Sequence, residues 1–221
     1  MDHINFFFES NKDEAQPYCI KAKVIFNPCS IELEVSYDEP NDEELEKPEN
    51  FSYLNKLPHN WLLVIREYID KNLVKSSDDR GNIIDSNGTR YTTVNGSAYE
   101  KYLQELIQAC LEASGTELPL QIFYSNGLEE KSFSISFLER KGMIQNGNKN
   151  KIKTIEWPTC QRLINRVFSL DYIYPENQKK LRKGPRIDPG IGMWFTLEEL
   201  KATNKHRKEH VEELFDLIKG F

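Results

Sequence analysis

Glu139 and Lys141 stand two residues apart at the end of an alternating apolar and polar segment, and their side chains suit phosphodiester chemistry. A carboxylate can hold Mg²⁺, and a nearby ammonium can assist the attacking water or the phosphate. In a strand both would project to the same face as Phe133, Ile135 and Phe137. This pair is therefore the first candidate site.

The Glu-x-Lys pattern resembles the second strand of the active-site hairpin in metal-dependent nucleases of the PD-(D/E)xK type. The resemblance covers a few residues and implies a second carboxylate that shares the metal ion. Glu117 is the nearest carboxylate on the first strand of the predicted hairpin, but its parity turns it to the other face. Only a β-bulge, or a carboxylate from elsewhere such as Glu112 or Asp85, would complete the site. A nuclease is therefore the alternative hypothesis, and a binding protein is the first.

The basic stretch within residues 174–195 is the second candidate site. Its cations could contact phosphates, and aromatic residues close to it could stack on bases. An acidic protein surface, reached by electrostatic steering, is the other partner considered. A third interpretation is a solvated loop whose charge is answered by the chain's own acidic segment. The residues assigned to anion binding are Lys179, Lys180, Arg182, Lys183, Arg186 and Trp194.

Two further motifs are weaker candidates for a functional site. The run from His206 to His210 matches the H-x-x-E-H pattern of inverted zinc peptidases, but helical phase turns Glu209 away from the side that the histidines share. A solvated helix flank is therefore favoured. Gly190-Ile191-Gly192 lacks the spacing of a dinucleotide-binding loop. No cofactor is expected for a binding protein, whereas the nuclease would need Mg²⁺.

Charge is distributed unevenly along the 221 residues, whose formal net charge is −6. Segment 38–50 carries seven acidic residues against one lysine, and segment 140–186 carries twelve Lys or Arg against three acidic residues. Such asymmetry indicates an anionic partner. It also suggests that the acidic segment covers the basic region as an internal mimic of the ligand.

The composition, 38% hydrophobic and 29% charged, is that of a globular protein. No apolar run approaches the roughly 18–20 residues that a membrane helix needs, and the acidic N-terminal segment does not resemble a signal peptide. The four cysteines show no ligand spacing, so they are expected to be reduced and buried. A cytoplasmic location and no membrane partner follow as predictions.

Three β-hairpins are predicted. The first pairs residues 20–26 with 31–37 across a four-residue turn, which sets Lys23 opposite Glu34 on a charged face. The second turns at Asn87-Gly88, and the third turns at Asn126-Gly127 between residues 118–125 and 131–139. Segment 38–50 is predicted to be a solvated acidic loop, and 174–195 a basic loop rich in Gly and Pro.

Helices are predicted where apolar residues recur at helical spacing. Two helices are predicted to begin near Pro58 and near Pro158. Two others are predicted to begin at capping boxes, one formed by Ser97 and Glu100 and one by Thr196 and Glu199. The last predicted helix carries Val211 to Ile218. Gly115 should close the helix that begins at Ser97, and a short strand is expected over residues 152–156.

The predicted fold is α+β, with a mainly antiparallel sheet of hairpins packed on one face by amphipathic helices in a single domain over residues 1–221. The predicted function is a non-catalytic cytoplasmic binding protein. Its basic 140–186 region would contact nucleic acid or an acidic protein partner. The oligomeric state and membership of a multi-protein system are left open.

Overall fold

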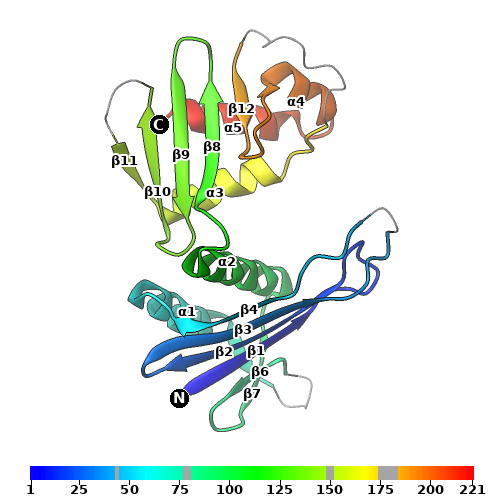
Figure 1. The fold of residues 1–221 in the computed structure, drawn as a ribbon, viewed down its shortest axis with the longest axis vertical. Coiled ribbons are helices and arrows are strands. Elements are labelled where there is room, and N and C mark those ends of the chain that lie inside the picture. The colour runs from blue at the N-terminus through cyan, green and yellow to red at the C-terminus, as the bar shows by residue number, and fades with distance from the viewer. Residues whose placement is uncertain (43–44, 77–80, 148–151, 174–183) are drawn as a thin grey trace. The chain divides into compact units, whose positions relative to one another are not determined.

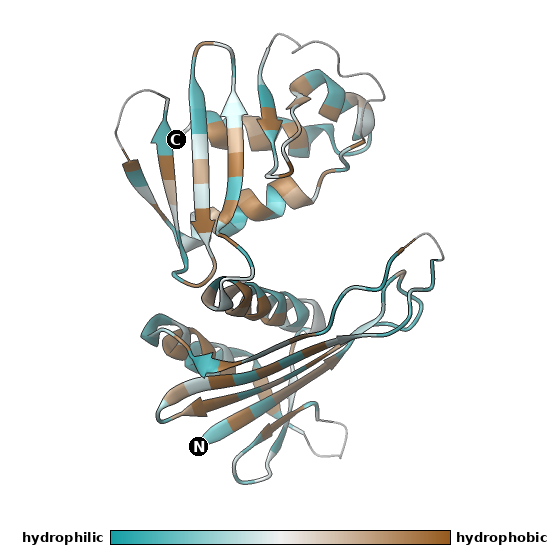
Figure 2. Ribbon diagram, in the orientation of Figure 1, coloured by the Kyte–Doolittle hydropathy of each residue, from teal (hydrophilic) through white to brown (hydrophobic). Residues whose placement is uncertain are grey.

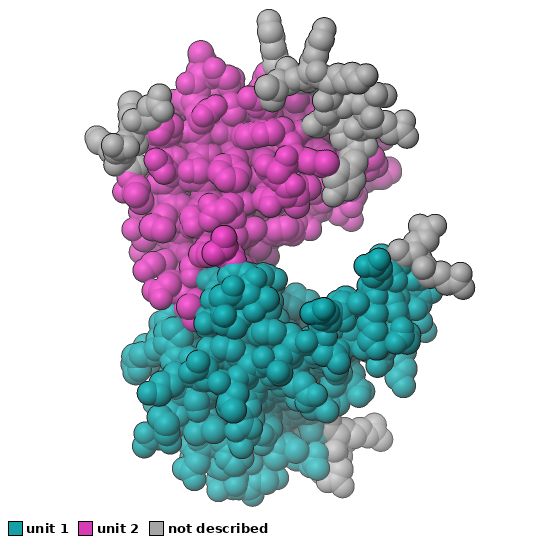
Figure 3. Space-filling view, in the orientation of Figure 1, with its two compact units in different colours: residues 1–117 teal, residues 118–221 magenta. Residues whose placement is uncertain are grey.

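The computed structural model describes residues 1–42, 45–76, 81–147, 152–173 and 184–221. The chain divides into two compact units, residues 1–117 and 118–221, and each is described by itself (Figure 3). Each unit has an antiparallel sheet with helices on one face (Figure 1), which confirms the predicted α+β class. The hairpins are shared between two sheets rather than joined in one. The single domain over residues 1–221 stays a prediction.

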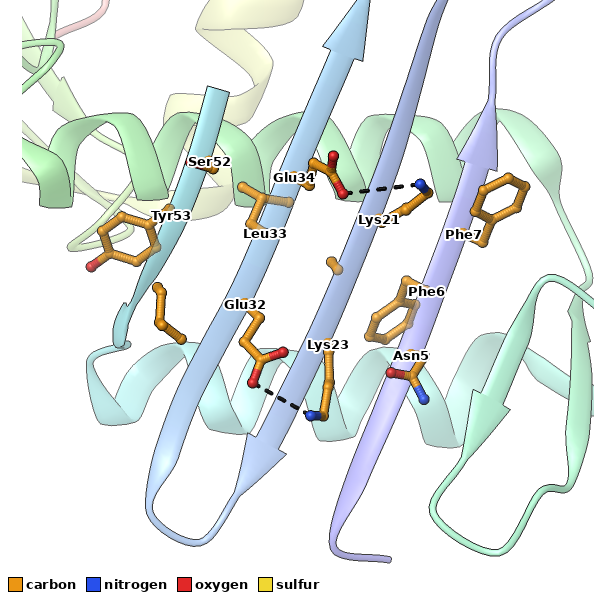
Figure 4. A pocket seen from close by; sticks show the side chains of 12 residues that line it. Asn5, Phe6, Phe7, Lys21, Lys23, Glu32, Leu33, Glu34, Ser52 and Tyr53 are labelled. Atoms are coloured by element: carbon orange, nitrogen blue, oxygen red, sulfur yellow. Dashed lines mark hydrogen bonds and ion pairs between the residues drawn. The ribbon is translucent and has the colours of Figure 1, made fainter. Parts of the chain in front are cut away.

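The described part of the first unit contains a seven-stranded antiparallel sheet and two helices. The strands are β1 (His3–Glu9), β2 (Tyr18–Phe26), β3 (Cys29–Tyr37), β4 (Phe51–Lys56), β5 (Leu73–Lys75), β6 (Ile83–Asp85) and β7 (Arg90–Thr93). They are ordered β4-β3-β2-β1-β6-β7-β5. Helices α1 (His59–Asn72) and α2 (Gly96–Ser114) cover one face of β1–β4 (Figures 1 and 4).

Alternating apolar residues decide which face of this sheet is buried (Figure 2). The buried positions of β1–β4 pack against the apolar stripes of the helices, where Trp61 and Leu103 are 0% exposed. The rings of Tyr68 and Tyr102 stack with centroids 4.0 Å apart between α1 and α2. Burial of this kind stabilises the unit by about 25 cal/mol for each Å² of apolar surface removed from water.

The first hairpin forms with the predicted faces but with a different register. Its turn is only two residues long, so Phe26 pairs with Cys29 and not with Ile31. Lys23 is consequently opposite Glu32, and Glu34 is opposite Lys21. The predicted four-residue turn was wrong, yet a shift of two residues preserves side-chain parity, and the charged face survives it.

Helix α2 begins differently from the prediction. The side chain of Asn95 accepts the backbone N–H of Ala98, so Asn95 is the N-cap and Ser97 lies within the first turn. The predicted capping box at Ser97 and Glu100 was therefore wrong. The predicted C-terminal glycine is confirmed, because Gly115 adopts the left-handed conformation with φ of +76°.

The described part of the second unit contains a six-stranded antiparallel sheet ordered β11-β10-β9-β8-β12-β13. The strands are β8 (Leu120–Ser125), β9 (Glu130–Ser136), β10 (Lys141–Asn146), β11 (Ile152–Glu156), β12 (Arg186–Asp188) and β13 (Phe195–Thr196). The helices are α3 (Trp157–Phe168), α4 (Leu197–Thr203) and α5 (Lys208–Lys219). Figure 1 shows α3 and α5 on one side of the strands.

The core of the second unit lies between the inward side chains of β8–β11 and these helices. At one contact Gly142 of β10 meets Cys160 of α3, where a Cβ on Gly142 would lie 2.7 Å from the Cys160 Sγ. At another, buried Lys131 of β9 donates from Nζ to the carbonyl oxygens of Ile218 and Lys219, each at 3.0 Å. This lysine satisfies carbonyls that the end of α5 would leave without partners.

Several predicted elements of the second unit are confirmed and two are not. The strand over 152–156, the helix beginning around Pro158 and the capping box of Thr196 and Glu199 are present. The third hairpin turns where predicted, but its second strand ends at Ser136 and not at residue 139. The predicted 174–195 loop includes β12 and the start of β13, because Arg186 and Ile187 pair with Ser125 and Tyr124 of β8.

None of the helices in the described ranges has the length and apolarity that a membrane crossing requires. The four cysteines are free thiols. Cys110 and Cys160 are buried as predicted, whereas Cys19 and Cys29 are only half-buried. Burial raises the pKa of Cys110 to about 12 and that of Cys160 to about 11, so both thiols stay protonated and inert at neutral pH.

Candidate functional site

In the described part of the first unit, α1 and α2 cover one face of β1–β4, and the opposite face carries a ladder of opposite charges (Figure 4). Lysines project from β2 and glutamates from the neighbouring β3, and apolar and polar side chains flank them on β1 and β4. We name this surface the ladder face; it consists of Asn5, Phe7, Lys21, Lys23, Glu32, Glu34, Ser52 and Leu54.

Two cross-strand ion pairs hold the centre of the ladder face. Lys23 Nζ lies 3.4 Å from Glu32 Oε1, and Lys21 Nζ lies 3.9 Å from Glu34 Oε2. The side chains of the second pair are each 60% exposed, so water screens this pair strongly. Such pairs stabilise a sheet by less than about 1 kcal/mol each. The charges therefore remain available to a partner that can displace water from them.

A hollow of about 580 Å³ lies over the ladder face. Each flank holds one exposed apolar side chain: Phe7 on β1 is 37% exposed and Leu54 on β4 is 74% exposed. An exposed leucine beside paired charges gives the hollow both an apolar and an ionic component. Sequence reasoning found the charges of β2 and β3 but missed β1 and β4, whose pairing with them creates the hollow.

The helix-free face of the second sheet has a different character. Serines occupy the outward positions of β9, with amide and apolar side chains beside them on β8 and β10. We name this surface the serine face; it consists of Gln121, Phe123, Glu130, Ser132, Ser134, Ser136, Lys141, Met143, Gln145, Ile152, Thr154 and Glu156. Gln121 Nε2 donates to Ser134 Oγ at 2.9 Å, and Phe123 and Met143 are 36% and 44% exposed.

Arg186 and Trp194 are the two residues of the predicted anion-binding set that the structure describes, and they are in contact. The Arg186 guanidinium lies over the Trp194 ring, with Cζ 5.0 Å from the ring centroid. Arg186 is on β12, paired with Ser125, at the margin of the serine face. The other four residues, Lys179, Lys180, Arg182 and Lys183, lie outside the described residues, as do Lys149 and Lys151 of the basic region.

The Gly-rich segment after β12 binds an internal carboxylate. Asp188, which is buried, accepts the backbone N–H groups of Gly190, Ile191 and Gly192 at 2.9, 3.0 and 3.1 Å. Gly190 also has φ of +101°, and a Cβ there would lie 2.4 Å from the Gln121 carbonyl oxygen. These N–H groups form the kind of anion-binding concavity that phosphates use, but Asp188 already occupies it.

Glu139 and Lys141 come together, but not on a shared strand. Glu139 lies in the turn between β9 and β10, and its Oε2 is 3.2 Å from the Nζ of Lys141. The expected shared strand parity was therefore wrong. Lys141 is also opposite Glu156 of β11, an acidic neighbour that sequence reasoning did not identify. The Lys141 ammonium, paired with Glu139, would compete with Mg²⁺ for this carboxylate.

The turn that holds Glu139 is fixed by its neighbours. Arg140 adopts a left-handed backbone conformation with φ of +50°, and its guanidinium lies 4.6 Å from the centroid of the Trp157 ring. The Trp157 ring in turn contacts Phe137 edge to face. A left-handed arginine is unusual, and the stacking contact compensates for its conformation.

The remaining motif does not assemble a metal site. His206 lies in a turn before α5, whereas His210 is inside the helix, so the two do not lie one turn apart on one helix as the H-x-x-E-H pattern requires. Arg207 donates to the Ser169 carbonyl oxygen at 2.7 Å. Within the described ranges, no three His, Cys, Asp or Glu side chains are grouped closely enough to bind a metal ion.

The acidic segment belongs to the first unit, and its described residues form neither helix nor strand, as predicted. Asn41 donates from its side chain to the Glu14 carbonyl oxygen, and Lys47 pairs with Glu39 at 2.9 Å. Residues 43–44 lie outside the described residues. That this segment covers the basic region stays a hypothesis.

Comparison with models of known families, with curated proteins and with solved structures finds no match to this chain.

Proposed function

We propose that the protein is a non-catalytic binding protein that takes an anionic partner, single-stranded nucleic acid, at Arg186 and Trp194 of its second unit. The Arg186–Trp194 contact carries the proposal. An arginine stacked on an aromatic ring offers a charge for phosphate and a flat surface for a base, which are the two features that single-strand binders combine.

The serine face extends this site. Hydroxyl and amide groups can hydrogen-bond to the edges of unpaired bases, and Phe123 and Met143 supply exposed apolar contacts. Lys141 and Arg186 lie toward opposite ends of the face, roughly 20 Å apart along the strand direction by the rise per residue. The centre of this platform bears no charge, and its margins carry these two cations together with Glu130 and Glu156.

Titration of labelled single-stranded DNA and RNA with the full chain, followed by fluorescence anisotropy at low and moderate salt, tests the proposal. Affinity should fall as salt rises, because phosphate contacts release counterions. Arg186→Ala and Trp194→Ala should each weaken binding by about tenfold, the loss typical of a stacked contact. Lys208→Ala removes an equal charge from α5, on the helix side of the same sheet, and should have little effect.

Two outcomes would redirect or end the proposal. Binding to poly-glutamate but not to nucleic acid would assign the site to an acidic protein. Binding to neither anion would overturn the proposal.

The Mg²⁺-dependent nuclease remains the alternative. Adding Mg²⁺ to plasmid and single-stranded substrates and comparing the wild-type chain with Glu139→Ala would reveal it. If Glu139 only pairs with Lys141, its replacement should not change the rate of cleavage. Cleavage that is lost in Glu139→Ala would therefore replace the binding hypothesis with the nuclease.

A further inference from the structure

The ladder face is complementary in charge to a second copy of itself, and we propose that two chains associate through it. Two rows of side chains cross the strands. One row is Phe7, Lys21, Glu34 and Ser52, and the other is Asn5, Lys23, Glu32 and Leu54. Each row places a lysine and a glutamate side by side at its centre, so positive and negative charges form two stripes along β2 and β3 (Figure 4).

Symmetry decides which arrangement of two copies this pattern favours. A two-fold axis that runs along the strands, between β2 and β3, lays the β2 of each copy over the β3 of the other. Lys21 then faces Glu34 of the second copy, and Lys23 faces Glu32. A two-fold axis across the strands would lay lysine over lysine and glutamate over glutamate. The stripes therefore favour one isologous arrangement and oppose the other.

The flanks of the face agree with the same axis. Phe7 and Asn5 on β1 come to lie over the β4 side chains of the second copy, Ser52 and Leu54. Phe7 and Leu54 are both exposed in the single chain, and each would be covered. The hollow of about 580 Å³ provides room for facing side chains to interdigitate, as they do when two sheets pack about 10 Å apart.

The size of the face sets the expected strength. Four strands spaced about 4.8 Å apart and paired over about six residues of 3.4 Å rise give a small contact area. A standard stable interface buries about 800 Å² on each partner, so a weaker dimer in the micromolar range is expected. Its affinity should fall with salt because the central contacts are ionic.

Charge reversal on the full chain tests the proposal by sedimentation velocity. The wild-type chain should form a dimer at low salt, and Lys21→Glu/Lys23→Glu should raise its dissociation constant at least tenfold. Glu32→Lys/Glu34→Lys should do the same. An equimolar mixture of the two double variants should restore association, because an all-glutamate face then meets an all-lysine face.

A fourfold variant controls for folding. Combining all four reversals restores the pairs within each chain and the pairs between chains, so the dimer should return. Circular dichroism must show that each double variant is folded. A wild-type chain that stays monomeric at high micromolar concentration, or double variants that dimerise as well as the wild type, would overturn the proposal.

Discussion

The two units are built on one scheme and differ in the face that the scheme leaves open. In both, alternating apolar side chains turn one side of an antiparallel sheet toward amphipathic helices. The ladder face then carries opposite charges on neighbouring strands, whereas the serine face carries hydroxyl and amide groups at its centre and charged groups of both signs at its margins. Packing constrains the residues of the covered faces, and the open faces are free of that constraint.

The covered faces provide the largest test of this comparison. Leu103 of α2 and Leu214 of α5 are both 0% exposed, one in each unit. Replacing either with alanine should cost about 2–5 kcal/mol of unfolding free energy, through lost burial and the cavity left behind. Hydrogen exchange read by mass spectrometry should show faster exchange in the unit that carries the substitution.

The same pair of variants tests the domain prediction. If the units unfold separately, Leu103→Ala leaves exchange in residues 118–221 unchanged, and Leu214→Ala leaves residues 1–117 unchanged. Equal acceleration across the whole chain in both variants would instead support a single cooperative domain, as the sequence predicts.

Gly142 provides the next largest effect, and it belongs to the second unit alone. A Cβ at this position would lie 2.7 Å from the buried Cys160 Sγ, so Gly142→Ala should lower the free energy of unfolding by about 1–3 kcal/mol. Cys160→Ala should relieve part of this loss in the double variant, and denaturant unfolding would measure the coupling. Gly96→Ala in α2, where an added Cβ would meet no atom within 4 Å beyond its chain neighbours and the helix's own backbone, should not destabilise the first unit.

The covered faces were also the part of the fold that the sequence predicts well. Periodicity is a local signal, so it identified the apolar sides of β2, β3, α1 and α3. It does not determine which distant strands pair, and the centre of the first sheet depends on such a pairing. β1 lies between β2 and β6, and it is separated from β6 by about eighty residues in sequence. No local sequence pattern predicts this pairing.

The sites were harder to predict because they depend on these pairings. The prediction for Glu139 and Lys141 depends on a strand that continues through both residues. The strand instead ends at Ser136, where the turn begins. The prediction for Arg186 and Trp194 rests on the basic and aromatic composition of their segment. Their contact depends on the pairing of β12 with β8, which composition does not reveal. The ladder face was half visible as alternating charges, but its flanks on β1 and β4 were not.

Asp85 gives a smaller effect that depends on pH and is specific to the first unit. Burial disfavours its charged form, but hydrogen bonds from the Thr89 and Asn87 N–H groups and the Tyr91 hydroxyl outweigh burial and hold the pKa below its ordinary value. The ionised carboxylate therefore stabilises the hairpin above the unfolded pKa of about 4, and this contribution is lost as pH falls through the folded pKa.

Asp85→Asn should consequently cost about 1 kcal/mol at neutral pH, the usual value of such hydrogen bonds, and less in acid. Thermal unfolding between neutral and acidic pH measures the difference between the variant and the wild type. Asp70→Asn, at an exposed position of α1, is the matched control and should leave the curve unchanged. A difference that grows toward acid pH would contradict the assigned direction of the pKa shift.

The smallest effect concerns the ladder face itself. A double-mutant cycle on Lys23 and Glu32, with alanine at each, should give a coupling below about 1 kcal/mol that declines with salt, since both side chains are well exposed. The measurement should be made at protein concentrations too low for the proposed dimer to form. A small coupling means that the sheet does not need its charges in order to fold, which agrees with the proposed association through the ladder face. A coupling well above this value would instead assign the ion pairs of the ladder face a role in stabilising the sheet. The difference between the two open faces would then lie in how each stabilises its own sheet.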